Sequence, residues 1–62
     1  MDENIKEMIQ EYMKEYKKGN FNKANIIAEK LDEEYNVNTT FSIDTIRFTD
    51  WQTNKVLYHF EL

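Results

Sequence analysis

The spacing of apolar residues changes once along this chain, close to residue 38, and the change limits the folds that are open to it. Up to residue 35, apolar residues recur every three or four positions, the spacing of an amphipathic α-helix. From residue 39 onward, threonine, aromatic and β-branched residues alternate between apolar and polar, as they do in β-strands. A chain of 62 residues has room for one core, so the sequence predicts a single α+β domain over residues 1–62.

The first expected helix covers residues 3–18. Its apolar residues fall on one stripe: Ile5, Met8, Ile9, Tyr12, Met13 and Tyr16. Glutamates recur every four residues and are expected on the opposite, solvated face: Glu3, Glu7, Glu11 and Glu15. Acidic residues at the start of this segment and lysines at its end suit the helix dipole.

A second helix is expected over residues 21–35. Gly19 can adopt the left-handed conformation that ends a helix, and Asn20 can cap the next one. The apolar stripe of this helix consists of Phe21, Ala24, Ile27, Ala28, Leu31 and Tyr35. Ile26 points away from that stripe, among polar residues. The short link between the segments predicts an antiparallel helical hairpin.

The turn between these helices resembles a known repeat. The stretch EYKKGNFNKANIIAEKL, residues 15–31, is similar to the middle of a tetratricopeptide repeat, and the matching positions are Tyr16, Gly19, Phe21, Ala24 and Ala28. The stretch occurs once, whereas arrays of such repeats need at least three units. The resemblance therefore implies a shared way of turning between two helices, without the peptide-binding groove of the family.

The second half of the chain predicts strands near residues 39–49 and 55–62, joined by a loop over residues 50–54. A β-bulge at Asp44–Thr45, opposite His59, would bring the apolar residues of both strands to one face. The expected pairs are Phe48 with Val56, Ile46 with Tyr58, Ile43 with Phe60 and Phe41 with Leu62. The expected outward residues are Ser42, Arg47, Leu57, His59 and Glu61. The predicted architecture is a two-layer α-α-β-β fold, in which the helical hairpin packs on one long, bulged β-hairpin.

Composition argues against several classes of function. The net charge of −4 does not suit a protein that binds nucleic acid directly, because such binding needs cationic side chains. The charged first residues do not form a secretory signal, and no apolar run reaches the roughly 20 residues of a membrane span. We therefore expect a cytoplasmic protein without a membrane partner.

Catalysis and metal binding are not expected either. The chain has no cysteine, and His59 is its only histidine, so a metal site would have to be built largely from carboxylates without any recognisable ligand spacing. A pair of His59 and Asp44 across the bulge is geometrically allowed, but such contacts on a strand face are usually structural. One glycine cannot form a glycine-rich phosphate loop. We expect no enzyme, no catalytic residue, no metal and no cofactor.

Trp51, the only tryptophan, lies in the predicted loop, and its role is open between three interpretations. It could cap the core, anchor a partner, or stand in solvent. Tryptophan is enriched among binding hot spots, so the candidate partner-binding residues are Trp51, Asp50, Gln52, Leu57 and Ile26. The edges of a two-stranded sheet are also open to strand addition by a protein partner or by a second copy in a homodimer.

The preferred function is a small protein-binding module that inhibits or regulates another protein. Seven of the eight basic residues are lysine and none of the residues is proline, a bias that suggests an AT-rich genome, such as that of a phage or mobile element acting against a host defence system. The alternative is an acidic mimic of nucleic acid that occupies the groove of a DNA- or RNA-binding protein. Its candidate residues are Glu3, Glu7, Glu11, Glu15, Asp32, Glu33 and Glu34.

Overall fold

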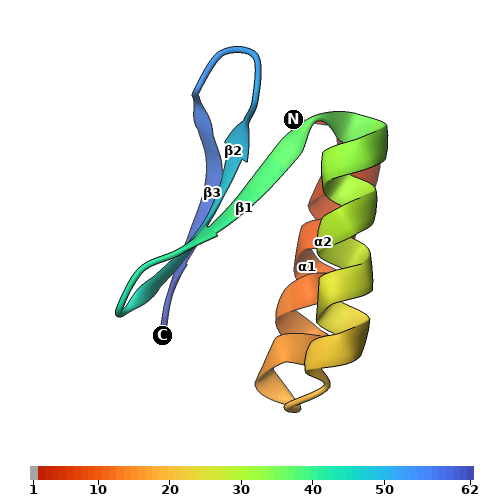
Figure 1. Cartoon of the computed structure of the whole chain (residues 1–62), viewed down its shortest axis with the longest axis vertical. Coiled ribbons are helices and arrows are strands. Elements are labelled where there is room, and N and C mark those ends of the chain that lie inside the picture. Colours follow the sequence, from red (N-terminus) through yellow and green to blue (C-terminus); the bar gives the residue numbers. More distant parts are fainter. Residues whose placement is uncertain (1) are drawn as a thin grey trace.

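The structure is a computed structural model that describes residues 2–62. It contains two helices followed by three strands: α1 (Glu3–Lys17), α2 (Phe21–Tyr35), β1 (Val37–Phe41), β2 (Thr45–Asp50) and β3 (Val56–Glu61). The strands form one antiparallel sheet in the order β1-β2-β3, and both helices lie on the same side of it (Figure 1). The α+β class predicted from the sequence is confirmed.

Local hydrogen bonds explain where α1 begins and ends. The Asp2 carboxylate accepts a hydrogen bond from the backbone N–H of Asn4 at 2.7 Å, as an N-cap residue does. At the other end, Gly19 has a φ of 80°, which confirms the conformation expected for it. The backbone N–H of Asn20 reaches back to the carbonyl oxygen of Glu15 at 2.9 Å, and this bond closes the helix end.

The end of α2 uses an asparagine where many helices have glycine. Asn36 has a φ of 57°, and its backbone N–H donates to the carbonyl oxygen of Asp32 at 3.2 Å. Asparagine tolerates this left-handed conformation better than most residues. The chain can therefore leave the helix and enter β1 directly at Val37.

The single long strand expected near residues 39–49 is wrong, because the chain reverses direction between Ser42 and Thr45. The backbone N–H of Ser42 donates to the carbonyl oxygen of Thr45 at 2.9 Å, and the Thr45 hydroxyl donates to the Asp44 carboxylate at 2.9 Å. Short polar side chains that bond to nearby groups favour a turn over a bulge. Ile43, expected to face the helices, is 101% exposed at the tip of this turn.

A β-bulge is present, but it lies at the other end of the sheet. Phe48 pairs with Tyr58 and Thr49 pairs with Val56, so Leu57 is the extra residue, in β3. The observed pairing of β2 with β3 differs from the expected one by two residues, because Ile46 lies opposite Phe60 rather than Tyr58. At the bulge, the Leu57 side chain is half-buried against the core instead of facing outward among polar residues.

The core lies between the helices and the first two strands. Its fully buried side chains come from all elements except β3: Ile9, Tyr12, Met13, Ala24, Leu31, Val37, Ile46 and Phe48. The ring of Tyr12 meets Phe48 edge-on, with centroids 5.4 Å apart. On β3, Tyr58 and Phe60 stack on each other at 4.9 Å and remain half-buried. Cover by the helices is therefore less complete over β3.

Two isoleucines three positions apart test the observed register. Ile46 is fully buried and Ile43 is fully exposed, so Ile46→Ala should lower the free energy of unfolding by about 2–5 kcal/mol. Ile43→Ala removes the same atoms from solvent-exposed surface and should change that free energy by less than about 0.5 kcal/mol. Urea denaturation of both variants provides the measurement. A comparable loss in both would support the long bulged hairpin instead.

Tyr12 should make the stability of the protein sensitive to alkaline pH. Burial raises the pKa of its hydroxyl from 10.0 to about 12, and the neighbouring Tyr16 adds to the effect. The unfolded chain loses this proton near its ordinary pKa, whereas the folded protein keeps it longer. The stabilisation is therefore complete below pH 10 and declines as the pH rises through the folded pKa.

The measurement is urea denaturation between pH 9 and pH 12, a range that includes both the ordinary and the raised pKa of Tyr12. Tyr12→Phe is the control, since it keeps the ring and lacks the ionisable group. We expect the wild-type protein to lose more stability across this range than the variant does. Identical pH profiles would mean that the Tyr12 hydroxyl ionises equally easily in both states.

Candidate protein-binding surfaces

The loop between β2 and β3 is organised by Asp50. Its carboxylate accepts hydrogen bonds from the backbone N–H groups of Gln52 at 2.8 Å and Thr53 at 3.2 Å. Its own backbone N–H donates to the carbonyl oxygen of Lys55 at 2.8 Å. Asn54 completes the turn with a φ of 59°. Asp50 therefore orders the loop, and its acceptor groups are directed at the loop itself.

Trp51 is attached to the end of α2 by two hydrogen bonds. Its backbone N–H donates to the carbonyl oxygen of Asn36 at 2.9 Å, and its indole N–H donates to the Asp32 carboxylate at 2.5 Å. The side chain nevertheless remains 52% exposed. It is thus neither a buried cap of the core nor a free loop side chain. The indole is held in a fixed position with about half of its surface open to solvent.

Two of the other predicted partner-binding residues, Leu57 and Ile26, do not share a surface with Trp51. Gln52 is exposed beside it in the loop, whereas Leu57 packs against the core. Ile26 is 55% exposed, as its position opposite the apolar stripe predicted. It lies on the helical layer, however, next to Ile27 and to residues of α1. The structure therefore groups Trp51 with Asp50 and Gln52 only.

The acidic residues also divide into two groups. Glu3, Glu7 and Glu11 are exposed, but Glu15 is only 8% exposed and accepts a hydrogen bond from the Asn20 side-chain amide at 2.9 Å. A four-residue step turns about 40° beyond a full circle at roughly 3.6 residues per turn, so three steps turn about 120°. That rotation carries Glu15 from the solvated face to the junction with α2. Its expected place in an exposed acidic column is wrong.

The acidic residues of α2 lie near the tryptophan. Asp32, Glu33 and Glu34 are exposed at the last turns of the helix. Asp32 is the acceptor for the indole of Trp51, so one of the three carboxylates takes part in holding the loop. This hydrogen bond joins residues 19 positions apart, and no local pattern in the sequence indicates it.

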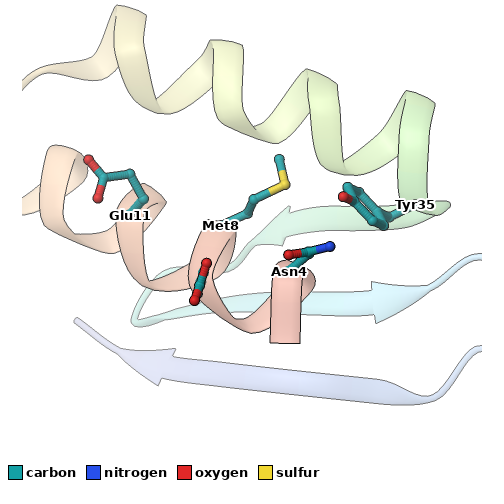
Figure 2. A pocket seen from close by; sticks show the side chains of 5 residues that line it. Asn4, Met8, Glu11 and Tyr35 are labelled. Carbon is teal, nitrogen blue, oxygen red and sulfur yellow. The ribbon is translucent and has the colours of Figure 1, made fainter. Parts of the chain in front are cut away.

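A shallow groove runs between α1 and the end of α2 (Figure 2). Met8 and Tyr35 provide apolar surface, and Asn4 lies between them. Glu7 and Glu11 of α1 also line the groove. Within residues 2–62, no three histidine, aspartate or glutamate side chains are grouped closely enough to hold a metal ion.

Sequence reasoning missed a set of exposed apolar residues at the opposite end of the molecule from Trp51. The set consists of Phe21, Phe41, Ile43 and Leu62. Tyr16 links it to the core, since its ring lies 5.3 Å from Phe21 and 6.3 Å from Phe41. Leu62 is fixed beside the turn by a hydrogen bond from its N–H to the carbonyl oxygen of Asp44 at 2.7 Å. The short polar side chains of Ser42, Asp44 and Thr45 were the sequence signal for a turn, and a turn there places Ile43 at the surface.

The proposed pairing of His59 with Asp44 depended on the bulge that the structure lacks. His59 lies opposite Arg47 in the sheet, and the Asp44 carboxylate accepts its hydrogen bond from Thr45. His59 and Glu61 are both exposed on the outer face of β3. The register therefore gives His59 a basic neighbour on β2.

Comparison with known proteins finds no match to the chain among protein-family models, curated proteins or solved structures. No helix within residues 2–62 is both long and apolar enough to cross a membrane. The function must therefore be argued from the surfaces themselves.

The tie between Asp32 and the indole can be tested through the fluorescence of Trp51, the only tryptophan. Asp32→Ala removes the acceptor, so the indole should gain freedom, with lower fluorescence anisotropy and emission shifted to longer wavelength. Loss of this hydrogen bond should also reduce stability by about 1 kcal/mol. Glu33→Ala is the matched control, because it removes a neighbouring exposed carboxylate. Equal spectra for the two variants would show that the bond does not hold the ring in solution.

Proposed function

We propose that the chain is a small protein-binding module that inhibits or regulates its partner through a contact centred on Trp51. The observation that carries this proposal is a half-exposed tryptophan fixed by two hydrogen bonds to the end of α2. Large aromatic side chains at the centre of an interface supply much of the binding energy. The Trp51 indole offers such a side chain on a small domain.

The fixed position of Trp51 matters because binding must overcome the entropy lost when mobile side chains become ordered. That loss amounts to roughly 0.5–1.5 kcal/mol for each immobilised side chain. At this site the ordering is already present in the free protein, since Asp50 holds the loop and Asp32 holds the indole. Binding energy from the exposed half of the ring can therefore contribute more fully to affinity.

The surroundings of Trp51 suit the rim of an interface. Gln52, Thr53, Asn54 and Lys55 are exposed polar residues of the same loop. An apolar anchor within a polar border is the usual arrangement of a non-obligate protein contact. The exposed carboxylates of Glu33 and Glu34 lie on the last turn of α2, and they favour a partner with basic groups beside its apolar pocket.

The acidic-mimic alternative is less well supported by the geometry. Burial of Glu15 leaves three exposed glutamates in the α1 column, and Lys6 and Lys14 are exposed on the same helix. Salt dependence separates the two functions. Binding by a mimic of nucleic acid should weaken steeply as salt rises, whereas a contact centred on tryptophan should change little.

The direct experiment uses the protein as bait in an extract of its native host, followed by affinity measurement with each purified partner. Trp51→Ala should weaken the complex by 2 kcal/mol or more, about thirtyfold in the dissociation constant. Ile43→Ala is the matched control, because it removes a fully exposed apolar side chain from the opposite end of the molecule.

Circular dichroism must first show that both variants are folded. Equal affinity of Trp51→Ala and the wild-type protein for every captured partner would contradict the proposal. Binding that is lost with Ile43→Ala instead would move the contact to the other end of the molecule.

A further inference from the structure

The outer edge of β3 has backbone groups that point away from the sheet. In an antiparallel ladder, alternate residues direct their N–H and C=O groups to opposite sides. The N–H of Leu62 donates to the carbonyl oxygen of Asp44, so Leu62, Phe60 and Tyr58 direct theirs toward β2. The backbone groups of His59 and Glu61 consequently point outward, where strand order places no partner among residues 2–62.

The two edges of the sheet are not equally open. β1 packs against α2, and residues of the two elements, including Ala28 and Thr39, line one shared groove. β3 is the strand farthest from β1 in the sheet order and lies on the side away from α2 (Figure 1). An added strand would meet α2 at the β1 edge and would have free access at the β3 edge.

The helix-facing side of β3 is also incompletely covered. Ile46 and Phe48 on β2 are fully buried, whereas Tyr58 and Phe60, directly opposite them on β3, are half-buried. Leu62, the next residue on this side, is 57% exposed. An apolar strip thus runs along the edge at which the backbone groups are free. A strand added there would bury this strip further and pair those groups.

We propose that the occupant of this edge is β3 of a second copy of the chain, paired antiparallel, with His59 of each copy opposite Glu61 of the other. In this register Phe60 lies on the two-fold axis, and Tyr58 of one copy lies opposite Leu62 of the other. The outward-pointing backbone groups of His59 and Glu61 then bond to each other across the interface. The two sheets become one continuous sheet with the apolar strips side by side.

Charge selects a second copy over an unrelated strand. On the outer face, Arg47 and His59 are neighbours across β2 and β3 and form a basic row. In the next row, Glu61 lies opposite Thr45. The antiparallel pairing extends each basic row with the Glu61 carboxylate of the other copy. The edge is therefore self-complementary, as a two-fold interface requires.

The contact is small, so the dimer should be weak. It involves one short edge strand and a few half-exposed side chains from each copy, which places it among interfaces that bury less than roughly 1,200 Å² in total. We expect dissociation constants in the micromolar range or above. The pairing does not involve Trp51, so it can be tested independently of the function proposed for the loop.

Charge reversal on the edge tests this pairing by sedimentation equilibrium of the full chain, from about 10 μM to 1 mM. His59→Glu places two carboxylates opposite each other twice in the dimer. Glu61→Lys removes the carboxylate that would extend each row and adds a cation to the row that contains Arg47. Each variant should weaken self-association roughly tenfold. In a dimer of one variant with the other, the glutamate introduced at position 59 lies opposite the lysine introduced at position 61, and the second pair is the natural one of His59 with Glu61. The mixture should therefore dimerise at least as well as the wild-type protein. Recovery on mixing cannot result from a folding defect.

Thr40→Glu is the matched control, because it adds a charge to an exposed residue on β1, at the far edge of the sheet. It should leave the association unchanged. A wild-type protein that remains monomeric at 1 mM would overturn the proposal. So would single variants that associate like the wild-type protein, or a mixture that associates no better than its components.

The register can be checked with single cysteines, since the natural chain has none. Under mild oxidation, a mixture of His59→Cys and Glu61→Cys should form the mixed disulfide in preference to either symmetric one. Preferred symmetric disulfides would contradict the register. Trp51→Ala should dimerise normally, so failure of the pairing and failure of the proposed partner contact give different results.

Discussion

The contact between Tyr12 and Phe48 joins the two halves of this protein, and the remainder of the structure depends on it. A three-stranded sheet with strands this short needs an apolar layer against one face to be stable. Tyr12 supplies a ring that is almost completely buried and meets Phe48 edge-on. Through Phe41 and Tyr16 the aromatic contacts continue to the surface. The raised pKa of Tyr12 follows from the same burial.

The helices could be predicted closely from the sequence, whereas the sheet register could not. Apolar residues at helical spacing define one buried face, and Gly19 marked the end of the first helix. Asn20 does lie at the N-cap of α2, but its side chain makes no capping bond there and donates to Glu15 instead. The apolar pattern around Ile43 is compatible with two backbone conformations. A β-bulge would bring all the apolar side chains to one face, whereas a turn exposes Ile43 to solvent. Hydrogen bonds among Ser42, Asp44 and Thr45 stabilise the turn, and Ile43 is exposed as a result.

At the candidate site, too, features set by neighbouring residues could be predicted from the sequence, whereas contacts between distant residues could not. The loop position of Trp51 beside Asp50 and Gln52 was evident from the sequence, and the structure confirms that the segment is a loop, ordered by Asp50. The hydrogen bond from Trp51 to Asp32 was not evident, because it joins two elements whose relative placement depends on the register of the whole sheet. The burial of Glu15 could have been foreseen from the rotation of a four-residue repeat around a helix.

Both proposed surfaces arise from one limitation, which is that two helices of fifteen residues each cover a three-stranded sheet incompletely. Cover is complete over Ile46 and Phe48 and declines toward β3 and toward the loop beyond it. The incomplete cover has different consequences at the Trp51 loop and at the β3 edge. At the loop, hydrogen bonds to α2 fix Trp51 with half of its surface open, which suits a foreign partner. At the β3 edge, unpaired backbone groups, an apolar strip and self-complementary charges coincide, which suits a second copy. Because the two surfaces share no side chain, a dimer formed at the edge would present two Trp51 loops at once.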